Sequence, residues 1–375
     1  MSGIYIHIPF CKQACHYCDF HFSTNLSLVE KMVAMICKEL ELRKNFLPAG
    51  APIQTIYFGG GTPSILKASH LDQILHTIYK FYNTDIKELT LEANPDDLSS
   101  EKLLDWKSMD FDRLSIGVQS FDQKILAYYN RAHNALESFQ AIDKAKKADF
   151  EKLSIDLIYG FPSEDHGIWE KDLFTALEMD PGHISSYALT VEPKTALGKW
   201  TQLGEFKEAD EDYVAEQFEH LMESCQQSGY IQYEISNFGK PGHFALHNTN
   251  YWKNTAYLGI GPGAHSYDGK HRGSNISNNV AYIKKMSENT PPYHIEEMSG
   301  LDICNEYILT SLRTIWGTDL KYIEKTFQVS LDQIHRQMMD SLLQEKMVQI
   351  KEGFLFLEPK GKLLADSIAA SLFVH

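Results

Sequence analysis

The sequence predicts an α/β protein built on a parallel sheet, and one pattern along the chain predicts it. Short apolar segments rich in β-branched residues alternate with longer segments whose apolar residues recur at helical spacing. This alternation is typical of parallel strands joined by right-handed crossover helices. The spacing fits a barrel-like or a doubly wound sheet, and periodicity alone does not choose between the two.

Six strands and six helices are expected in the first 230 residues. The predicted strands are residues 3–8, 53–58, 88–93, 113–118, 152–158 and 183–190, and the predicted helices are residues 27–46, 67–82, 99–107, 134–148, 167–178 and 208–228. Ser27 and Ser99 stand where helix N-caps are expected, and Pro48 and Pro181 follow predicted helix ends.

The alternation ends near residue 232, which divides the chain into three predicted parts. Residues 1–232 form the alternating core, and residues 233–300, rich in Gly, aromatic residues and His, are expected to be an irregular segment packed on it. A Pro-Pro pair at 291–292 predicts a boundary. Residues 301–375 predict a small helical domain with a hairpin over 348–358, an order that resembles a winged helix.

Distinctive polar motifs follow several predicted strands directly. Three cysteines follow the first strand and "GGGTP" (59–63) follows the second, while Glu92, Gln119 and Asp156 stand at or near the ends of the next three. The carboxyl ends of parallel strands meet at one edge of a sheet, where such folds bind their ligands. The sequence therefore predicts one site at that edge.

Composition limits the class of protein and its partners. The formal net charge is −15, which argues against nucleic acid as the chief partner. No apolar segment approaches the length that spans a bilayer, and the N-terminus lacks the pattern of a signal peptide, so a cytoplasmic location is expected. Cys37, Cys225 and Cys304 are interpreted as buried small apolar residues rather than parts of a disulfide framework.

The other three cysteines, Cys11, Cys15 and Cys18, form a C-x3-C-x2-C cluster that has three interpretations. They are structural thiols, they bind zinc with His7, His16 or His21, or they bind three irons of a 4Fe–4S cluster. The last accounts for the missing fourth cysteine, because three ligands leave one iron open to another molecule.

With this motif after its first strand, the chain resembles the radical S-adenosylmethionine (SAM) superfamily. The resemblance implies a radical SAM partial (β/α)6 barrel with a small C-terminal helical, winged-helix-like domain. It also implies a 4Fe–4S cluster on Cys11, Cys15 and Cys18, with SAM on its open iron. The "GGGTP" segment fits this, since glycines let a backbone approach a ligand closely. No Gly-Lys-Ser/Thr follows it, so it is not a P-loop.

Within the superfamily the chain is similar to the oxygen-independent coproporphyrinogen III oxidase group. The matching stretches include "IHIPFC", "YFGGGTPS", "LEANP", "RLSIGVQSF", "NRAH", "SIDLIYGFP" and "GIGPGAHS". The resemblance implies SAM-contacting roles for Tyr5, Gly60, Gly61, Thr62, Glu92, Gln119, Arg131 and Asp156. Read one at a time, Glu92, Gln119 and Asp156 are equally well explained as strand-end residues that bond loop backbone.

Two departures separate the chain from the true oxidases. Those enzymes carry a further cysteine where this chain has Phe20, and they have a longer segment before the cysteines. Both features resemble the HemW-type heme chaperones, which lack the oxidase activity. "HNTNYW" (247–252) also matches a motif linked to heme in that group. It makes His247 the heme-binding candidate, with His243 and His265 as lesser ones.

The resemblance therefore implies a heme chaperone that binds heme and transfers it to an acceptor protein. Three roles of the cluster stay open: support of a homodimer, peripheral membrane association and reduction of the heme iron. One alternative is an enzyme that decarboxylates the propionates of coproporphyrinogen III by radical chemistry, and another is a radical SAM enzyme acting on RNA.

Overall fold

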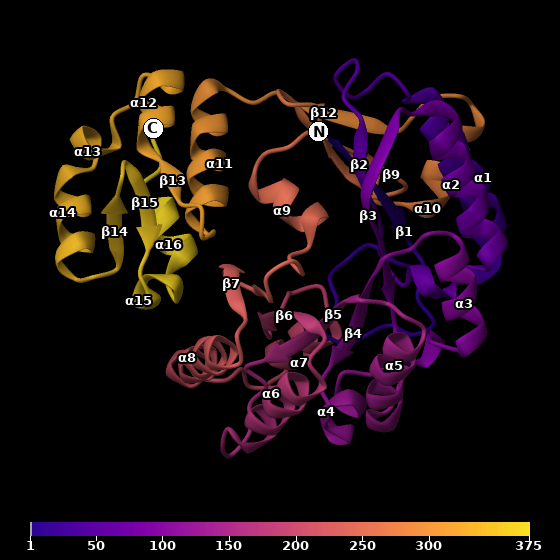
Figure 1. Ribbon diagram of the computed structural model, residues 1–375, viewed down its shortest axis with the longest axis horizontal. Helices are drawn as coiled ribbons and strands as arrows, with labels where there is room; N and C mark the ends of the chain where they lie inside the picture. The colour runs from indigo at the N-terminus through magenta and orange to yellow at the C-terminus, as the bar shows by residue number, and fades with distance from the viewer. Residues whose placement is uncertain (1) are drawn as a thin grey trace.

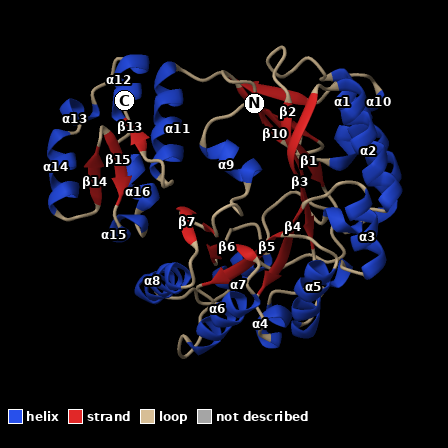
Figure 2. Cartoon of the chain, in the orientation of Figure 1, coloured by secondary structure: helices blue, strands red, loops and turns tan. Residues whose placement is uncertain are grey.

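A computed structural model describes residues 2–375 and contains one large mixed sheet (Figures 1 and 2). Its strands are β1 (Ser2–Ile8), β2 (Ile53–Gly60), β3 (Thr84–Ala93), β4 (Arg113–Gln119), β5 (Lys152–Tyr159), β6 (Gly182–Ala188), β7 (Ile231–Glu234), β8 (Asn237–Gly239), β9 (Tyr257–Ile260), β10 (His265–Tyr267), β11 (Arg272–Asn275) and β12 (Tyr293–Glu296). Their spatial order is β12-β11-β10-β9-β1-β2-β3-β4-β5-β6-β8-β7.

The strands from β1 to β6 are parallel and follow chain order, so the predicted α/β fold is confirmed. All six predicted strands form within a few residues of their expected bounds. These strands are nearly continuous apolar segments because helices cover the outer face of the sheet and most side chains on the inner face are buried as well. The sheet curves into an open crescent rather than a closed barrel (Figure 2).

The helices of this unit are α1 (Val29–Leu42), α2 (Ala68–Phe81), α3 (Ser100–Ser108), α4 (Gln123–Tyr128), α5 (Ala135–Lys147), α6 (Gly167–Met179), α7 (Ala196–Gln202), α8 (Glu211–Gln227), α9 (Leu246–Trp252) and α10 (Asn279–Ser287). The predicted N-cap at Ser99 is confirmed, since its hydroxyl accepts from the Lys102 N–H at 3.2 Å. The cap at Ser27 is wrong. Asn25 accepts from the Ser27 N–H instead and starts a 3-10 turn ahead of α1.

Residues 233–300 contain several short strands and two helices, which corrects the expectation of an irregular segment. They hold half of β7 and all of β8 to β12, which extend the sheet at both edges, and β9 adds a parallel strand beside β1. These strands are three or four residues long, too short to show an alternating pattern in sequence. The Pro-Pro pair at 291–292 precedes β12, so the sheet continues past the boundary predicted there.

The C-terminal part has its own apolar core, separate from the core under the main sheet. Its helices are α11 (Gly300–Leu312), α12 (Leu320–Phe327), α13 (Leu331–Ile334), α14 (Arg336–Gln344), α15 (Pro359–Lys362) and α16 (Ala365–Ser371), around a sheet of β13 (Thr318–Asp319), β14 (Val348–Lys351) and β15 (Phe354–Leu357). The strands β14 and β15 form the predicted hairpin.

Two of the isolated cysteines are fully buried, Cys225 in the main core and Cys304 in the C-terminal one, while Cys37 is half-buried. From Ser2 to His375, none of the helices has both the length and the apolar character needed to cross a bilayer.

Candidate functional site

A cavity of about 650 Å³ opens at the carboxyl ends of the parallel strands. Ten of the residues predicted for the site line it: Cys11, Cys15, Cys18, Gly60, Gly61, Thr62, Glu92, Gln119, Arg131 and Asp156. These residues come from the loops or ends of β1 to β5, as expected for a parallel sheet. Tyr5 and His247 were also predicted and do not line it.

The loop that carries the three cysteines is tied to the glycine segment that follows β2. The Gly61 N–H donates to the Ile8 carbonyl at 2.8 Å, and the Thr62 N–H donates to the Phe10 carbonyl at 2.7 Å. At its far end the loop closes on itself, because the Cys11 N–H donates to the Ser23 carbonyl at 3.1 Å. The two motifs are therefore one structural unit.

The glycines are required by this unit rather than only by a ligand. Gly60 has φ +107°, and a Cβ there would lie 2.6 Å from the imidazole of His7. A Cβ on Gly61 would lie 2.5 Å from the Phe10 carbonyl oxygen. Only residues without a side chain let the cysteine loop and the β2 end come this close.

The three thiols share one wall of the cavity, and burial raises the pKa of both Cys11 and Cys18 to about 11. In the part of the chain that the structure describes, no three His, Cys, Asp or Glu side chains gather closely enough to hold a single metal ion. The donor set is three thiolate-forming sulfurs around an open cavity, which fits a cluster with its irons at separate corners better than one zinc ion.

The imidazoles considered as zinc ligands have other partners. A ring nitrogen of His7 lies 2.9 Å from the His21 carbonyl, and one of His16 lies 2.7 Å from the Tyr128 carbonyl. The Nε2 atom of His21 lies 2.8 Å from the Asn279 amide oxygen. These bonds favour structural roles for the three histidines.

Arg131 extends under the cysteine loop. Its Nη1 atom lies 3.3 Å from both the Cys15 sulfur and the Tyr17 hydroxyl, and its Nη2 atom donates at 2.7 Å to the Asn94 amide oxygen and the Gly117 carbonyl. The buried Nε atom has no partner. Within residues 2–375 this guanidinium forms no ion pair with a carboxylate, so it keeps a positive charge available beside the cavity.

Two carboxyl groups also line the cavity. Glu92 accepts from the Tyr57 hydroxyl at 2.7 Å and from the Gly60 N–H at 3.1 Å, and Asp156 accepts from the Ser115 hydroxyl at 3.4 Å. Burial raises the pKa of Glu92 to about 7, with a further contribution from Asp156, and burial raises the pKa of Asp156 to about 6. Such a pair stabilises a bound cation.

Gln119 ends β4 in a strained conformation. Its φ is +68°, and the register between β4 and β5 shifts between Ile116 and Gln119. A non-glycine residue in the left-handed region costs free energy that the surrounding structure must offset. The shift turns the Gln119 side chain into the cavity wall.

Tyr5 and His247 lie below the floor of the cavity. The Tyr5 hydroxyl lies 3.2 Å from Nδ1 of His7. The Nδ1 atom of His247 lies 2.8 Å from the Thr55 hydroxyl, its Nε2 atom lies 2.8 Å from the Tyr251 hydroxyl, and only 2% of the residue is exposed. Both nitrogens are engaged, so His247 cannot ligate iron in this arrangement. The next residue of α9, Asn248, does line the cavity.

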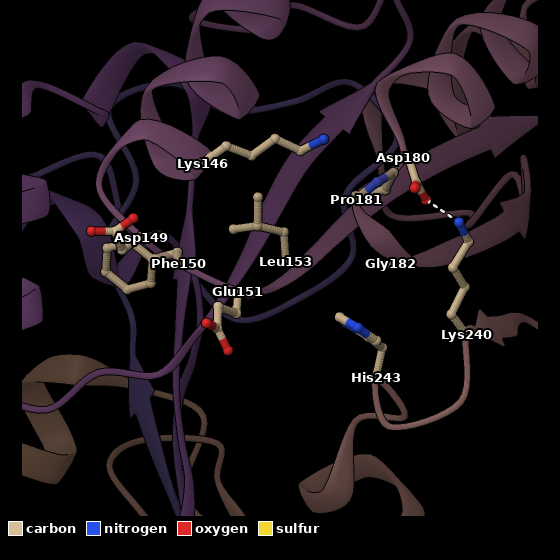
Figure 3. Close-up of a pocket in the computed structure, with 10 residues that line it drawn as sticks. All are labelled: Lys146, Asp149, Phe150, Glu151, Leu153, Asp180, Pro181, Gly182, Lys240 and His243. Carbon is tan, nitrogen blue, oxygen red and sulfur yellow. Dashed lines mark ion pairs between the residues drawn. The ribbon is translucent and has the colours of Figure 1, made fainter.

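The lesser heme candidates lie elsewhere. His243 faces a separate hollow of about 290 Å³ at the opposite end of the strands, beside the Asp180–Lys240 ion pair (Figure 3). A Cβ on Gly182 would lie 2.5 Å from this imidazole, which packs on the bare backbone. His265 starts β10 and is exposed, and it does not line the cavity of the cysteines.

Sequence reasoning missed several residues that line the cavity. Tyr17 stands between two of the cysteines, and Asn94 follows Glu92 in "EANP". Their proximity in sequence to these motifs could have indicated that they line the cavity. Ser115, Ser185 and Tyr187 lie within strands. Nothing in their spacing separates them from ordinary strand residues.

Comparisons with known proteins agree with this geometry. The Radical SAM superfamily model matches residues 5–175, and the HemN C-terminal domain model matches residues 298–364. The solved structure of the coproporphyrinogen III oxidase HemN from Escherichia coli superposes with a TM-score of 0.85, at 20% identity, over 100% of this chain and 90% of that chain. That likeness shows the shared fold.

Relatives of higher identity match along their whole length. The heme chaperone HemW of Bacillus subtilis is 35% identical over 374 residues, which are 98% of this chain and 98% of the relative. The heme chaperone HemW of Synechocystis is 32% identical over 99% of this chain and 96% of the relative. With the cysteine loop, the glycine segment and the strand order in place, this chain belongs to the HemW family of the radical SAM superfamily.

Proposed function

We propose that the protein is a heme chaperone, which binds heme and hands it to an acceptor protein in the cytoplasm. The observation that carries the proposal is the convergence of Cys11, Cys15 and Cys18 on one cavity, in a chain similar to heme chaperones from end to end. Phe20 supports it further. It stands on the cavity rim with 74% of its surface exposed, at the position where the oxidases have a cysteine.

In this proposal the three cysteines hold a 4Fe–4S cluster. Bound there with one iron open, the cluster would supply a coordination site for SAM and a single electron. The chain's contribution is to fix the loop, since the glycine segment clamps its first residues and the Cys11–Ser23 bond closes it. The Arg131 guanidinium beside Cys15 stabilises the negative charge of a thiolate.

SAM would occupy the space between Arg131 and the two carboxyl groups. Its carboxylate suits the guanidinium, and its ammonium group suits Glu92 and Asp156. The N–H groups of Gly60, Gly61 and Thr62 all donate within the protein, so this segment offers a ligand its carbonyl oxygens. Gln119 both accepts and donates. Tyr5 would act indirectly, by packing against Gly59 and His7.

Heme is proposed to bind through the "HNTNYW" segment, with His247 as the ligand. That role requires the imidazole to leave Thr55 and Tyr251. We also propose that the C-terminal domain acts as a separate unit from about residue 300, because it packs around its own core.

One experiment separates this proposal from the oxidase alternative. Protein reconstituted anaerobically with iron and sulfide is titrated with hemin, and on the same sample deoxyadenosine and protoporphyrinogen are measured after addition of SAM and coproporphyrinogen III. We expect a saturable Soret band and no protoporphyrinogen at catalytic rates. Catalytic formation of protoporphyrinogen would identify an oxidase instead.

A further inference from the structure

The short helix α9 lies inside the crescent of the main sheet, between the strands and α11 of the C-terminal domain (Figure 1). It has seven residues, too few for a helix to be stable in water by itself. Its conformation therefore depends on contacts at its two ends. Those contacts come from different domains.

The sheet holds the amino end of α9. The Leu246 and His247 N–H groups donate to the Glu88 carboxylate at 2.9 and 2.8 Å, and that carboxylate pairs with Arg113 at 2.9 Å. Glu88 and Arg113 are both buried. The His247 ring stacks on Tyr57 at 5.0 Å, in a space that exists because residue 3 is glycine: a Cβ there would lie 3.2 Å from the ring.

The C-terminal domain holds the carboxyl end of α9 through paired cation–π contacts. The Arg313 guanidinium lies 5.4 Å from the Trp252 ring, and the Lys253 ammonium lies 4.1 Å from the Trp316 ring. The Asn254 amide donates to the Thr310 hydroxyl at 3.4 Å. Cation–π contacts of this kind are individually weak, so the C-terminal domain holds this end of α9 reversibly.

These contacts join the main sheet unit and the C-terminal domain, which have separate apolar cores. Arg313 is itself anchored by the buried Glu234 of β7, at 2.9 and 3.1 Å, and by Asp366 of α16. The two units also touch through Ile235, which packs against both cores, and through the Ile315 N–H, which donates to the Tyr233 carbonyl at 3.1 Å. Relative motion of two domains of one chain is the default expectation at such a contact. A small displacement of the C-terminal domain would remove the contacts of the carboxyl end of α9, where Tyr251 bonds Nε2 of His247, and would leave those of the amino end.

We propose that residues 310–316, the end of α11 and the loop after it, form a latch on α9. While the C-terminal domain is docked, the latch keeps the Tyr251 hydroxyl on Nε2 of His247, and this nitrogen is freed when the domain undocks. The inference rests on the proposed function in one respect, that His247 takes heme. Because Asn248 lines the cavity, an occupant of the cavity touches the same helix. The latch thus couples the cavity, His247 and the C-terminal domain through one element with two positions.

The test compares two double variants of the full chain. Lys253→Met with Trp316→Leu removes the shorter of the two cation–π contacts at the carboxyl end of α9 without leaving the buried Glu234 unpaired. Lys80→Met with Phe81→Leu is the matched control, since it removes a cation–π pair of 4.8 Å on α2. Lys253→Met alone, at an exposed residue, serves where the double variant does not fold. Amide hydrogen exchange of residues 246–252 is measured without heme, and hemin affinity is measured by titration.

We expect about tenfold faster exchange of residues 246–252 in the latch variants, no change in the control, and several-fold tighter hemin binding that His247→Gln abolishes. Unchanged exchange in a folded latch variant would overturn the latch. Faster exchange with unchanged hemin affinity would overturn the link to His247. If even the unmodified protein binds no hemin, the proposed function fails, and the exchange rates alone decide whether the latch exists.

Discussion

The Nη1 atom of Arg131 lies 3.3 Å from the sulfur of Cys15, while Nη2 of the same guanidinium binds Asn94 and Gly117. One side chain therefore connects the cysteine loop with the ends of β3 and β4. This bridge sets the distance between the wall that would carry the cluster and the strand ends that would carry SAM.

Replacing Arg131 by Met should weaken SAM binding at least about tenfold, because one charge-assisted hydrogen bond contributes about 1.5–3 kcal/mol. Arg131→Lys should recover only part of the affinity, since an ammonium group cannot reproduce the planar fork. The measurement is calorimetric titration of SAM into reconstituted protein with its iron content determined. Equal SAM affinities of the unmodified protein and the two variants would show that Arg131 does not bind SAM.

Replacing Cys11, Cys15 and Cys18 together by Ala should abolish the brown chromophore near ~400 nm that thiolate-ligated clusters give. Cys225→Ala is the control, because that thiol is fully buried in the main core and does not line the cavity. Iron and acid-labile sulfide are determined in both proteins after anaerobic reconstitution. A triple variant that still takes up both in normal amounts would show that the ligands lie elsewhere.

Gly60→Ala should destabilise the protein by roughly 1–3 kcal/mol or more, from the strained backbone together with the clash against His7. Gly269→Ala is a matched control: its φ is +103°, and nothing lies within 4 Å of its Cβ position. The difference between the two free energies of unfolding in denaturant isolates the clash. Similar losses at both positions would mean that contact with His7 is not what requires glycine at residue 60.

The sequence was sufficient for the parallel part of the fold and for most of the cavity. Long apolar strands such as β2 and β5 and capped helices such as α3 carry their own local signals. The cysteines and "GGGTP" were placed correctly because strand-end motifs converge in any parallel sheet. To place these motifs, only the order of the strands is needed, and not the positions of the side chains.

The remainder depended on tertiary packing. Strands of three or four residues, such as β8 and β10, form because the existing sheet edge offers them hydrogen-bond partners. The accessibility of His247 could not be predicted either, since it is set by Thr55 and Glu88, which are distant in sequence. The same holds for Gly60, whose neighbour His7 comes from another strand.

The buried carboxyl groups predict a specific pH dependence of stability without ligand. Burial raises the pKa of Glu92 from 4.5 to about 7 and that of Asp156 from 3.8 to about 6. Between these values the folded state binds more protons than the unfolded state, so both groups lower the free energy of unfolding as pH rises from about 4 to 7. Ionisation then leaves two negative charges in one cavity. A cationic ligand would offset them.

Buried histidines act in the opposite direction. Burial lowers the pKa of His247 to about 3 and that of His7 to about 4, so the unfolded state binds more protons and stability rises with pH up to the ordinary value of 6.5. The free energy of unfolding of the whole protein therefore combines a decrease with pH from the carboxyl groups and an increase with pH from the histidines. The contribution of the carboxyl groups is therefore obtained from the difference in stability between the unmodified protein and a variant that lacks one of them.

The measurement is the free energy of unfolding of the cluster-free protein from pH 5 to pH 8, compared with Glu92→Gln and Asp156→Asn. We expect each variant to gain stability relative to the unmodified protein as pH rises, because a neutral amide has no charge to bury. Asp85→Asn is the control, since the Lys87 ammonium lowers the pKa of Asp85 below its ordinary 3.8 and this carboxyl is therefore ionised in both the folded and the unfolded state from pH 5 to pH 8. Its replacement should shift stability by the same amount at every pH of the series. Differences that do not vary with pH would mean that Glu92 and Asp156 ionise as freely in the folded chain as in the unfolded one, and the cavity would lose its argument as a cation site.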